Sequence, residues 1–274
     1  MTAAFHQLEV DVTGGSLIVR RRPGRGPTLL LLHYWGGSGR TWDPMLAHLD
    51  PQIPVASYDH RGWGRSGTLP GPFDLAQLAD DAAAVMEALD TDAVLVGHSM
   101  GGKVAQLVAA EHPSALTGLV LVAPAPPEPP ATITPQFQQQ LVHAYDTVDS
   151  VASAIDLVLT AIPLAAPLRA TVLEDSLACA AQARSEWPLR GIAANITTAA
   201  QQISVATTVI AGSRDVVEPV DVLRQHLLPF IPDAHVHILD GPGHLIPLEA
   251  PAELAEQLTL HGFKETRRQR KTAT

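Results

Sequence analysis

A serine sits between two glycines in the segment GHSMG (residues 97–101), where an apolar run gives way to a helical pattern. A sharp strand-to-helix turn that exposes a serine oxygen leaves no room for side chains at neighbouring positions, and Gly97 and Gly101 provide that room. The segment therefore predicts that Ser99 is a nucleophile held above the end of a buried strand.

A serine hydroxyl needs a base to take its proton, and that base needs a partner to orient it. Of the 12 histidines, His244 is the best placed, because its segment GPGHLIPLEAP (241–251) follows the last predicted strand. Asp215 lies just beyond the preceding predicted strand, in GSRDVVEP (212–219). By itself, Asp215 would be interpreted as a helix-capping residue. The order Ser99, Asp215, His244, with separations of 116 and 29 positions, instead indicates a catalytic triad.

The elements that must position these residues alternate between strand-like and helix-like patterns, which is typical of an α/β fold. We expect a mostly parallel sheet of about eight strands flanked by helices. The predicted strands are HQLEVDV, SLIVR, TLLLL, PVASY, AVLV, GLVLV, ATTVIA and HVHIL, of which the first two form a hairpin. The predicted helices cover residues 41–49, 75–89, 100–111, 219–228 and 251–258.

One segment interrupts this alternation. After the proline-rich stretch APAPPEPP, residues 136–199 show helical patterning without a strand, which predicts a helical lid. We therefore divide the chain into a first part of the core (1–126), a cap (127–200), a second part of the core (201–263) and a basic, disordered tail (264–274). Four apolar residues of the cap are expected to line the acyl side of a pocket, with Trp187 the best candidate: Leu157, Leu159, Ile162 and Trp187.

Composition and charge exclude several classes of partner. The residues before Lys264 include 13 basic and 27 acidic ones, a formal charge of −14, which disfavours binding to nucleic acid or to an anionic membrane. No apolar run is long enough to span a bilayer. The first residues do not resemble a secretory signal, and the single Cys179 cannot form an internal disulfide, so we expect a soluble cytoplasmic protein. The oligomeric state is left open.

The sequence resembles the α/β-hydrolase superfamily, in particular its single-domain esterase, haloperoxidase-like and lactonase branch with a helical cap. The resemblance covers almost the whole chain and depends on LLLLHYWGG, YDHRGWGRSG, GHSMGG, GSRDVVEP and GPGHLIPLE. It implies that the backbone N–H groups of Met100 and Trp35 form the oxyanion hole. Tyr34 replaces a glycine that is usual in the family, which would crowd this loop.

The resemblance also guides the interpretation of other polar residues. The segment YDHRGWGRSG, with Asp59, His60 and Arg61, is interpreted as a structural loop. We expect no cofactor and no metal, because His235 and His237 alternate on a strand and face opposite ways. The predicted substrate pocket includes four residues around the triad, of which Trp187 comes from the cap: Tyr34, His98, Trp187 and Leu245.

These residues predict a serine hydrolase that cleaves a small-molecule carboxylic ester or lactone through an acyl-enzyme, with an apolar pocket for a small or medium acyl group. Two alternatives stay open. One is a ligand receptor on the same fold that keeps the triad but has little turnover. The other is a cofactor-free oxygenase of the same superfamily. In that branch the acid can follow the earlier strand GLVLV, where this chain has Ala123 and Pro124.

Overall fold

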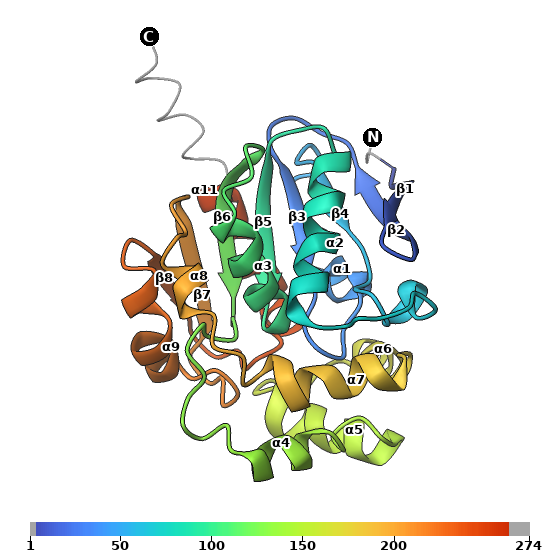
Figure 1. Ribbon diagram of the computed structural model, residues 1–274, viewed down its shortest axis with the longest axis vertical. Helices are drawn as coiled ribbons and strands as arrows, with labels where there is room; N and C mark the ends of the chain where they lie inside the picture. The colour runs from blue at the N-terminus through green and yellow to red at the C-terminus, as the bar shows by residue number, and fades with distance from the viewer. Residues whose placement is uncertain (1–3, 263–274) are drawn as a thin grey trace.

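The computed structural model describes residues 4–262, which form an eight-stranded sheet with the strand order β1-β2-β4-β3-β5-β6-β7-β8. The first two strands pair antiparallel, β2 pairs antiparallel with β4, and the remaining pairs are parallel (Figure 1). The strands are β1 (His6–Val12), β2 (Gly15–Arg22), β3 (Thr28–Leu32), β4 (Val55–Ser57), β5 (Ala93–His98), β6 (Leu116–Val122), β7 (Thr207–Gly212) and β8 (His235–Leu239). The predicted mostly parallel sheet of about eight strands is confirmed.

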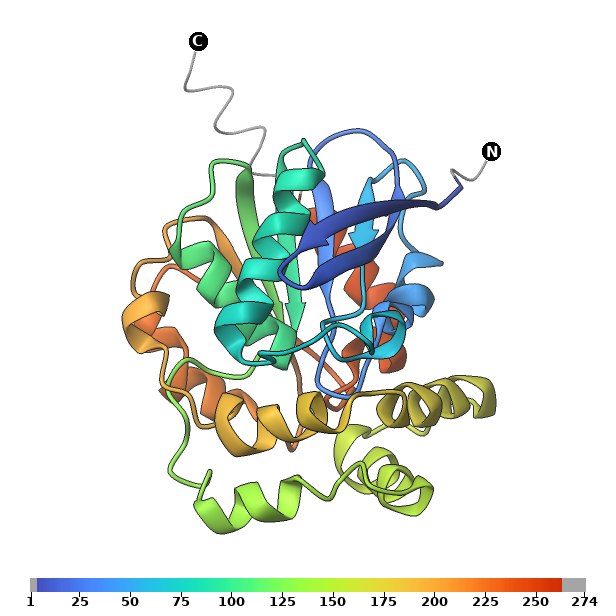
Figure 2. The ribbon, with the colours of Figure 1, turned by 45° about the vertical axis from the view of Figure 1, so that its right-hand side comes forward.

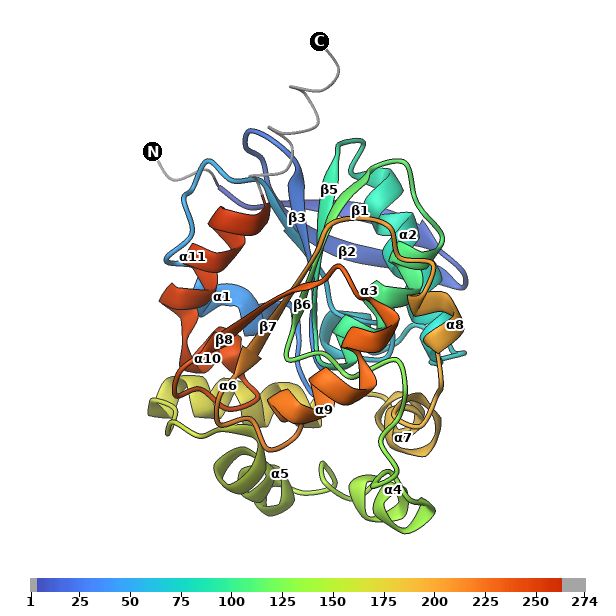
Figure 3. The same cartoon turned by 90° about the vertical axis from the view of Figure 1, so that its left-hand side faces the viewer.

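Helices cover both faces of the sheet because successive residues of each central strand point to opposite sides. Leu30, Leu95 and Leu119 pack with helices on one face, whereas Leu29, Val94 and Val120 pack with helices on the other (Figure 3). The first face carries α2 (Leu75–Ala88), α3 (Met100–Ala110) and α9 (Val220–His226), and the second carries α1 (Asp43–Leu46), α10 (Ile246–Glu249) and α11 (Pro251–Gly262).

The chain between β6 and β7 contains helices and no strand of the sheet. The helices are α4 (Pro135–Leu141), α5 (Val148–Ala154), α6 (Ala166–Leu177), α7 (Ala181–Glu186) and α8 (Thr197–Ala200), with π-helical turns at Ile155–Leu159 and Trp187–Gly191. Helices α4 to α7 lie across the end of the sheet at which β5 and β6 finish (Figures 1 and 2), whereas α8 packs beside α3. From here on, the cap means residues 135–191, which include α4 to α7 and the two π-helical turns.

The helix predicted over 41–49 is wrong in its form. A 3₁₀ turn (Gly39–Trp42) precedes the short α1, because Pro44 has no N–H to continue a helix that started earlier. The helix predicted over 219–228 ends at His226, and a separate 3₁₀ turn (Leu228–Phe230) contains Pro229. The predicted basic tail (264–274) lies outside the described residues. In the part of the chain that is described, no helix has both the length and the hydropathy of a membrane span.

Candidate active site

Ser99 lies at the turn between β5 and α3, in the conformation expected for an exposed nucleophile. Its φ of 53° and ψ of −115° are outside the regions that residues other than glycine ordinarily adopt. The turn is close-packed, because a Cβ at Gly97 would be 2.3 Å from the carbonyl oxygen of Gly101, and a Cβ at Gly101 would be 2.5 Å from that of Leu32. Glycine is therefore required at both positions, as the sequence predicts.

The structure brings Ser99, His244 and Asp215 together. His244 Nε2 lies 2.9 Å from Ser99 Oγ, and His244 Nδ1 lies 2.9 Å from Asp215 Oδ2. All three side chains are buried. Ser99 follows β5, Asp215 follows β7 and His244 follows β8, all at the same end of the sheet, where ligands of open α/β sheets bind.

Asp215 has two roles at once. Its Oδ1 accepts hydrogen bonds from the backbone N–H groups of Val217 (2.8 Å) and Glu218 (3.0 Å), while Oδ2 faces His244. Burial alone would raise the pKa of Asp215, but the charge and hydrogen bond of His244, together with the two backbone N–H groups, bring it below its ordinary value. The carboxylate is thus ionised and fixed in place by the turn that it accepts from. The helix-capping interpretation of Asp215 is wrong, because α9 begins only at Val220 and has no side-chain cap.

His98 supports the base from behind and does not line the pocket, which corrects its predicted place. Its Nε2 lies 2.8 Å from the carbonyl oxygen of His244 and donates to it. Burial lowers the pKa of His98 to about 3, so the ring is neutral. Leu245 is also absent from the pocket wall, because it is fully buried in the main core where α10 begins.

The two predicted oxyanion donors are the N–H of Met100, which follows Ser99 directly, and the N–H of Trp35, a residue that lines the same cavity as Ser99. Among the described residues, neither Met100 N–H nor Trp35 N–H has a hydrogen-bond partner. The Trp35 ring lies between core and cap: its Nε1 donates to the carbonyl oxygen of Arg184 (2.9 Å), and it stacks on Tyr145 at 4.1 Å between centroids. Tyr145 also donates its hydroxyl to the Trp35 carbonyl oxygen.

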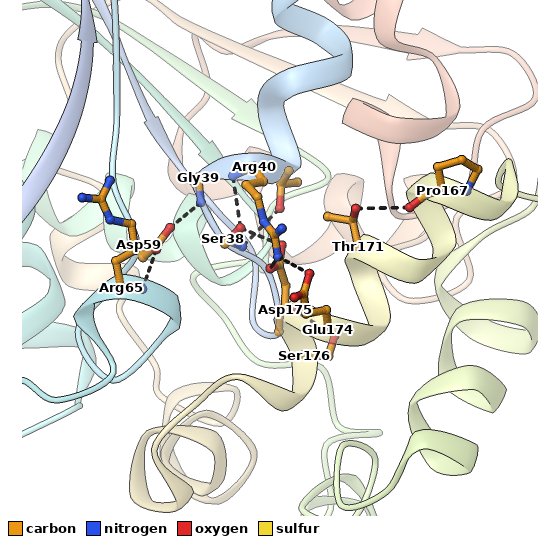
Figure 4. Close-up of polar contacts among 12 residues, drawn as sticks. Ser38, Gly39, Arg40, Asp59, Arg65, Pro167, Thr171, Glu174, Asp175 and Ser176 are labelled. Carbon is orange, nitrogen blue, oxygen red and sulfur yellow. Dashed lines mark hydrogen bonds and ion pairs between the residues drawn. The ribbon is translucent and has the colours of Figure 1, made fainter. Parts of the chain in front are cut away.

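The cap holds the rest of this loop through α6 (Figure 4). Ser38 Oγ donates to Asp175 Oδ2 at 2.6 Å, and Arg40 forms an ion pair with the same carboxylate. Ser176 Oγ donates to the carbonyl oxygen of Gly36 at 3.0 Å. Sequence reasoning missed these contacts, because they join residues more than 130 positions apart and no local pattern marks them.

Tyr34 fits in this loop because of a neighbouring glycine. The Tyr34 ring is buried and packs against Gly37. A Cβ at position 37 would be only 2.6 Å from the edge of this ring, so a larger residue there would clash with it. The crowding expected from Tyr34 is therefore relieved by Gly37, and the ring becomes part of the pocket wall.

Ser99 and His244 line a cavity of about 650 Å³ between cap and core, with mostly apolar walls. Tyr34, Trp187 and Leu159 contribute to these walls, as the sequence predicts, and the Trp35 ring does so as well. Leu157 and Ile162 do not, and their predicted place is wrong. Leu157 is 78% exposed because the π-helical turn (Ile155–Leu159) directs Leu159 inward and Leu157 outward. Glu218 also lines the cavity, although the sequence analysis did not single it out.

The segment YDHRGWGRSG is structural. Arg61 is fully buried, forms a two-pronged ion pair with Asp81 (2.9 and 2.6 Å) and donates to the carbonyl oxygens of Thr13 and Pro70. Asp59 accepts from the backbone N–H groups of Gly39 and Arg65, linking this segment to the Trp35 loop. Across residues 4–262, no group of three or more histidine, cysteine or acidic side chains has a metal-binding arrangement.

The fold and the motifs are those of one large family. The sequence model of the Alpha/beta hydrolase family matches residues 29–257, which include Ser99, Asp215 and His244. The chain belongs to this family. The strand order, the turn at Ser99 and the loops after β7 and β8 are thus features of an α/β hydrolase.

Individual relatives have hydrolase names. The chain is 40% identical over 117 residues to a Caulobacter vibrioides protein named carbamate hydrolase RutD, covering 42% of this chain and 41% of that one. It is 38% identical over 107 residues to the pimeloyl-[acyl-carrier protein] methyl ester esterase of Pseudoalteromonas atlantica, covering 39% and 40%. Each match thus spans about two fifths of the relative. The enol-lactonase of Burkholderia xenovorans has the same fold, with a TM-score of 0.78, 22% identity and coverage of 92% and 98%.

Proposed function

We propose that this α/β hydrolase is a serine hydrolase that cleaves a carboxylic ester or lactone of a small molecule through an acyl-enzyme. The observation that carries the proposal is the hydrogen-bonded series Ser99, His244 and Asp215 at the wall of a large apolar cavity, with two unpartnered backbone N–H groups beside it. Relatives named as esterases and hydrolases support the same class of reaction.

In the proposed reaction, Ser99 Oγ attacks the substrate carbonyl carbon while its proton moves to His244 Nε2. The N–H groups of Met100 and Trp35 stabilise the negative charge on the former carbonyl oxygen. The carbon–oxygen bond to the alcohol then breaks, and His244 gives that oxygen its proton. Water attacks the acyl-enzyme by the reverse sequence and releases the acid. Asp215 stays ionised throughout, which keeps the Nδ1 proton in place and stabilises the imidazolium.

The experiment that tests the proposal is labelling with a fluorophosphonate, followed by steady-state hydrolysis of p-nitrophenyl esters. Wild type should be labelled on Ser99 and should turn over many times. Ser99→Ala should fold but lose labelling and nearly all turnover, since the turn accepts alanine but no acyl-enzyme can form. Ser153→Ala, on the exposed side of α5, is the control and should behave as wild type.

Two outcomes would count against the proposal. Turnover by Ser99→Ala above a few per cent of the wild-type value would refute a serine mechanism. Labelling of Ser99 without repeated turnover of any ester would instead support a ligand receptor on this fold. The oxygenase alternative gains no structural observation, because the carboxylate that reaches His244 follows β7 and not β6.

A further inference from the structure

One acidic side chain faces the apolar cavity outside the triad. Glu218 is the one carboxylic acid among the residues that line this cavity. The residue is only 7% exposed, and within residues 4–262 no hydrogen bond or ion pair reaches its carboxyl group. A buried polar group without a partner costs free energy, and such groups in native proteins ordinarily have a structural or functional reason.

The position of Glu218 is fixed by the triad itself. Its backbone N–H donates to Asp215 Oδ1 at 3.0 Å, and Pro219 follows it directly. The cavity wall close to Glu218 in sequence is apolar and includes Val217, Pro219 and Val222. Burial, together with the neighbouring Asp215 carboxylate, raises the pKa of Glu218 well above its ordinary value. In either protonation state, the Glu218 carboxyl group has an oxygen that accepts a hydrogen bond.

A buried lysine lies near Glu218 without neutralising it. Lys103 is on α3, four residues after Ser99, and its Nζ donates to the carbonyl oxygen of Ile192 at 3.4 Å and lies 6.0 Å from the centre of the Trp187 ring. Lys103 and Glu218 interact electrostatically, but no ion pair within 4 Å joins them among the described residues. The Glu218 carboxyl group is thus available to a ligand in the cavity.

We propose that Glu218 determines substrate specificity, and that preferred substrates carry an uncharged hydrogen-bond donor, an amide N–H or a hydroxyl, on the non-reacting arm that occupies the cavity. This inference rests on the proposed function. An ammonium group is disfavoured because the buried cation of Lys103 already lies near Glu218. A carboxylate arm is disfavoured because the ionised Asp215 is close and the walls are apolar.

The test uses pairs of p-nitrophenyl esters that differ only in the donor. Each pair consists of an N-acetylaminoalkanoate and its N-methyl analogue, which lacks the N–H, with two to six carbons between the ester and the amide. Wild type should favour the N–H ester by about tenfold or more in kcat/KM at one or more chain lengths. Glu218→Met should abolish this ratio, because methionine fills the same volume without an acceptor.

Two further variants show whether the carboxyl group itself is responsible. Glu218→Gln should keep part of the ratio, since the amide oxygen still accepts. Asp221→Asn removes an exposed carboxylate on α9 and should keep the wild-type ratio. The rate of fluorophosphonate labelling reports whether each variant is folded, and Glu218→Leu replaces Glu218→Met if that variant does not fold.

Failures of the two proposals look different. If wild type is labelled and hydrolyses esters but shows no N–H preference at any chain length, or if Glu218→Met keeps the preference, the role of Glu218 is refuted and the serine mechanism stands. If wild type is neither labelled nor active, the proposed function is refuted and this inference falls with it.

Discussion

Replacing Asp215 by asparagine would reverse the position of the proton on His244. In the wild type, Oδ1 accepts two backbone N–H groups and Oδ2 accepts His244 Nδ1–H. The asparagine oxygen would stay with the two N–H groups, because turning the amide over would place its NH₂ against them. The NH₂ group would then face His244 Nδ1, which must accept. Nε2 would carry the proton and could not take one from Ser99.

The size of the effect follows from those two backbone hydrogen bonds. Restoring the productive tautomer requires the amide to turn and leaves two buried N–H groups unpaired, at about 1–3 kcal/mol each. This corresponds to a loss of about 30-fold to 10⁴-fold in the productive fraction. The missing negative charge also weakens stabilisation of the imidazolium, so kcat should fall by about a thousandfold or more.

The measurement is kcat on a p-nitrophenyl ester at saturation, together with the rate of fluorophosphonate labelling, which needs the same base and should fall in parallel. Asp221→Asn is the control, because that side chain is 79% exposed and forms an ion pair with Arg224 on the same helix. Its kcat should stay within about twofold of wild type. A loss below tenfold for Asp215→Asn, or equal losses in the two variants, would refute this account of the acid.

Three further substitutions test the cavity and the buried charges. Trp187→Ala should change the order of kcat/KM among p-nitrophenyl esters from acetate to octanoate, because Trp187 lines the cavity. It should also lower the free energy of unfolding by about 3–5 kcal/mol. An unchanged order of kcat/KM with only a lower Tm would show that Trp187 has a packing role alone. Burial lowers the pKa of Lys103 from 10.5 to about 8. Between pH 8 and 10.5, the unfolded chain therefore binds more protons than the folded protein. In this range the free energy of unfolding of the wild type should rise with pH by up to about 1.4 kcal/mol per pH unit relative to that of Lys103→Met. Urea unfolding at pH 8 and 10 measures the free energy of unfolding of both proteins. An equal change with pH in the wild type and in Lys103→Met would contradict this prediction. Asp81→Ala leaves Arg61 buried and unpaired, so it should cost about 3–5 kcal/mol in urea unfolding while Ser99 still reacts with a fluorophosphonate; lost labelling without destabilisation would contradict a structural role.

The features that the sequence predicts well are those with local causes. Leu29 to Leu32 form a continuous apolar run because β3 is buried on both faces, and such a run is visible without a structure. Gly97 and Gly101 mark the turn at Ser99 because each would clash with backbone if it had a side chain. Each of the three residues lies in the turn or loop that follows a strand of the parallel sheet. Strand ends alone therefore place the three side chains at one edge.

Other features depend on contacts that no local pattern records. His98 is next to Ser99 in sequence, which predicts a place in the pocket, but its ring packs beside Trp42 and donates to the His244 backbone. Leu157 and Leu159 are two positions apart in one apolar stretch, and only the π-helical turn decides which one is buried. Glu218 has the appearance of an ordinary surface acid in sequence, and its burial results from walls that distant segments supply.

In the proposed mechanism, the cap is part of the catalytic apparatus as well as a cover for it. The proposed donor Trp35 N–H belongs to a loop whose carbonyl oxygens at Trp35 and Gly36 accept from Tyr145 and Ser176, both cap residues. A further cap residue, Asp175, binds Ser38 at the far end of the same loop. Because an oxyanion donor acts only when its direction is fixed before the reaction, displacement of the cap would move the donor as well as open the cavity. Cap residues that never touch substrate are therefore expected to affect kcat, whereas those that only line the apolar walls should act mainly on the choice of acyl group.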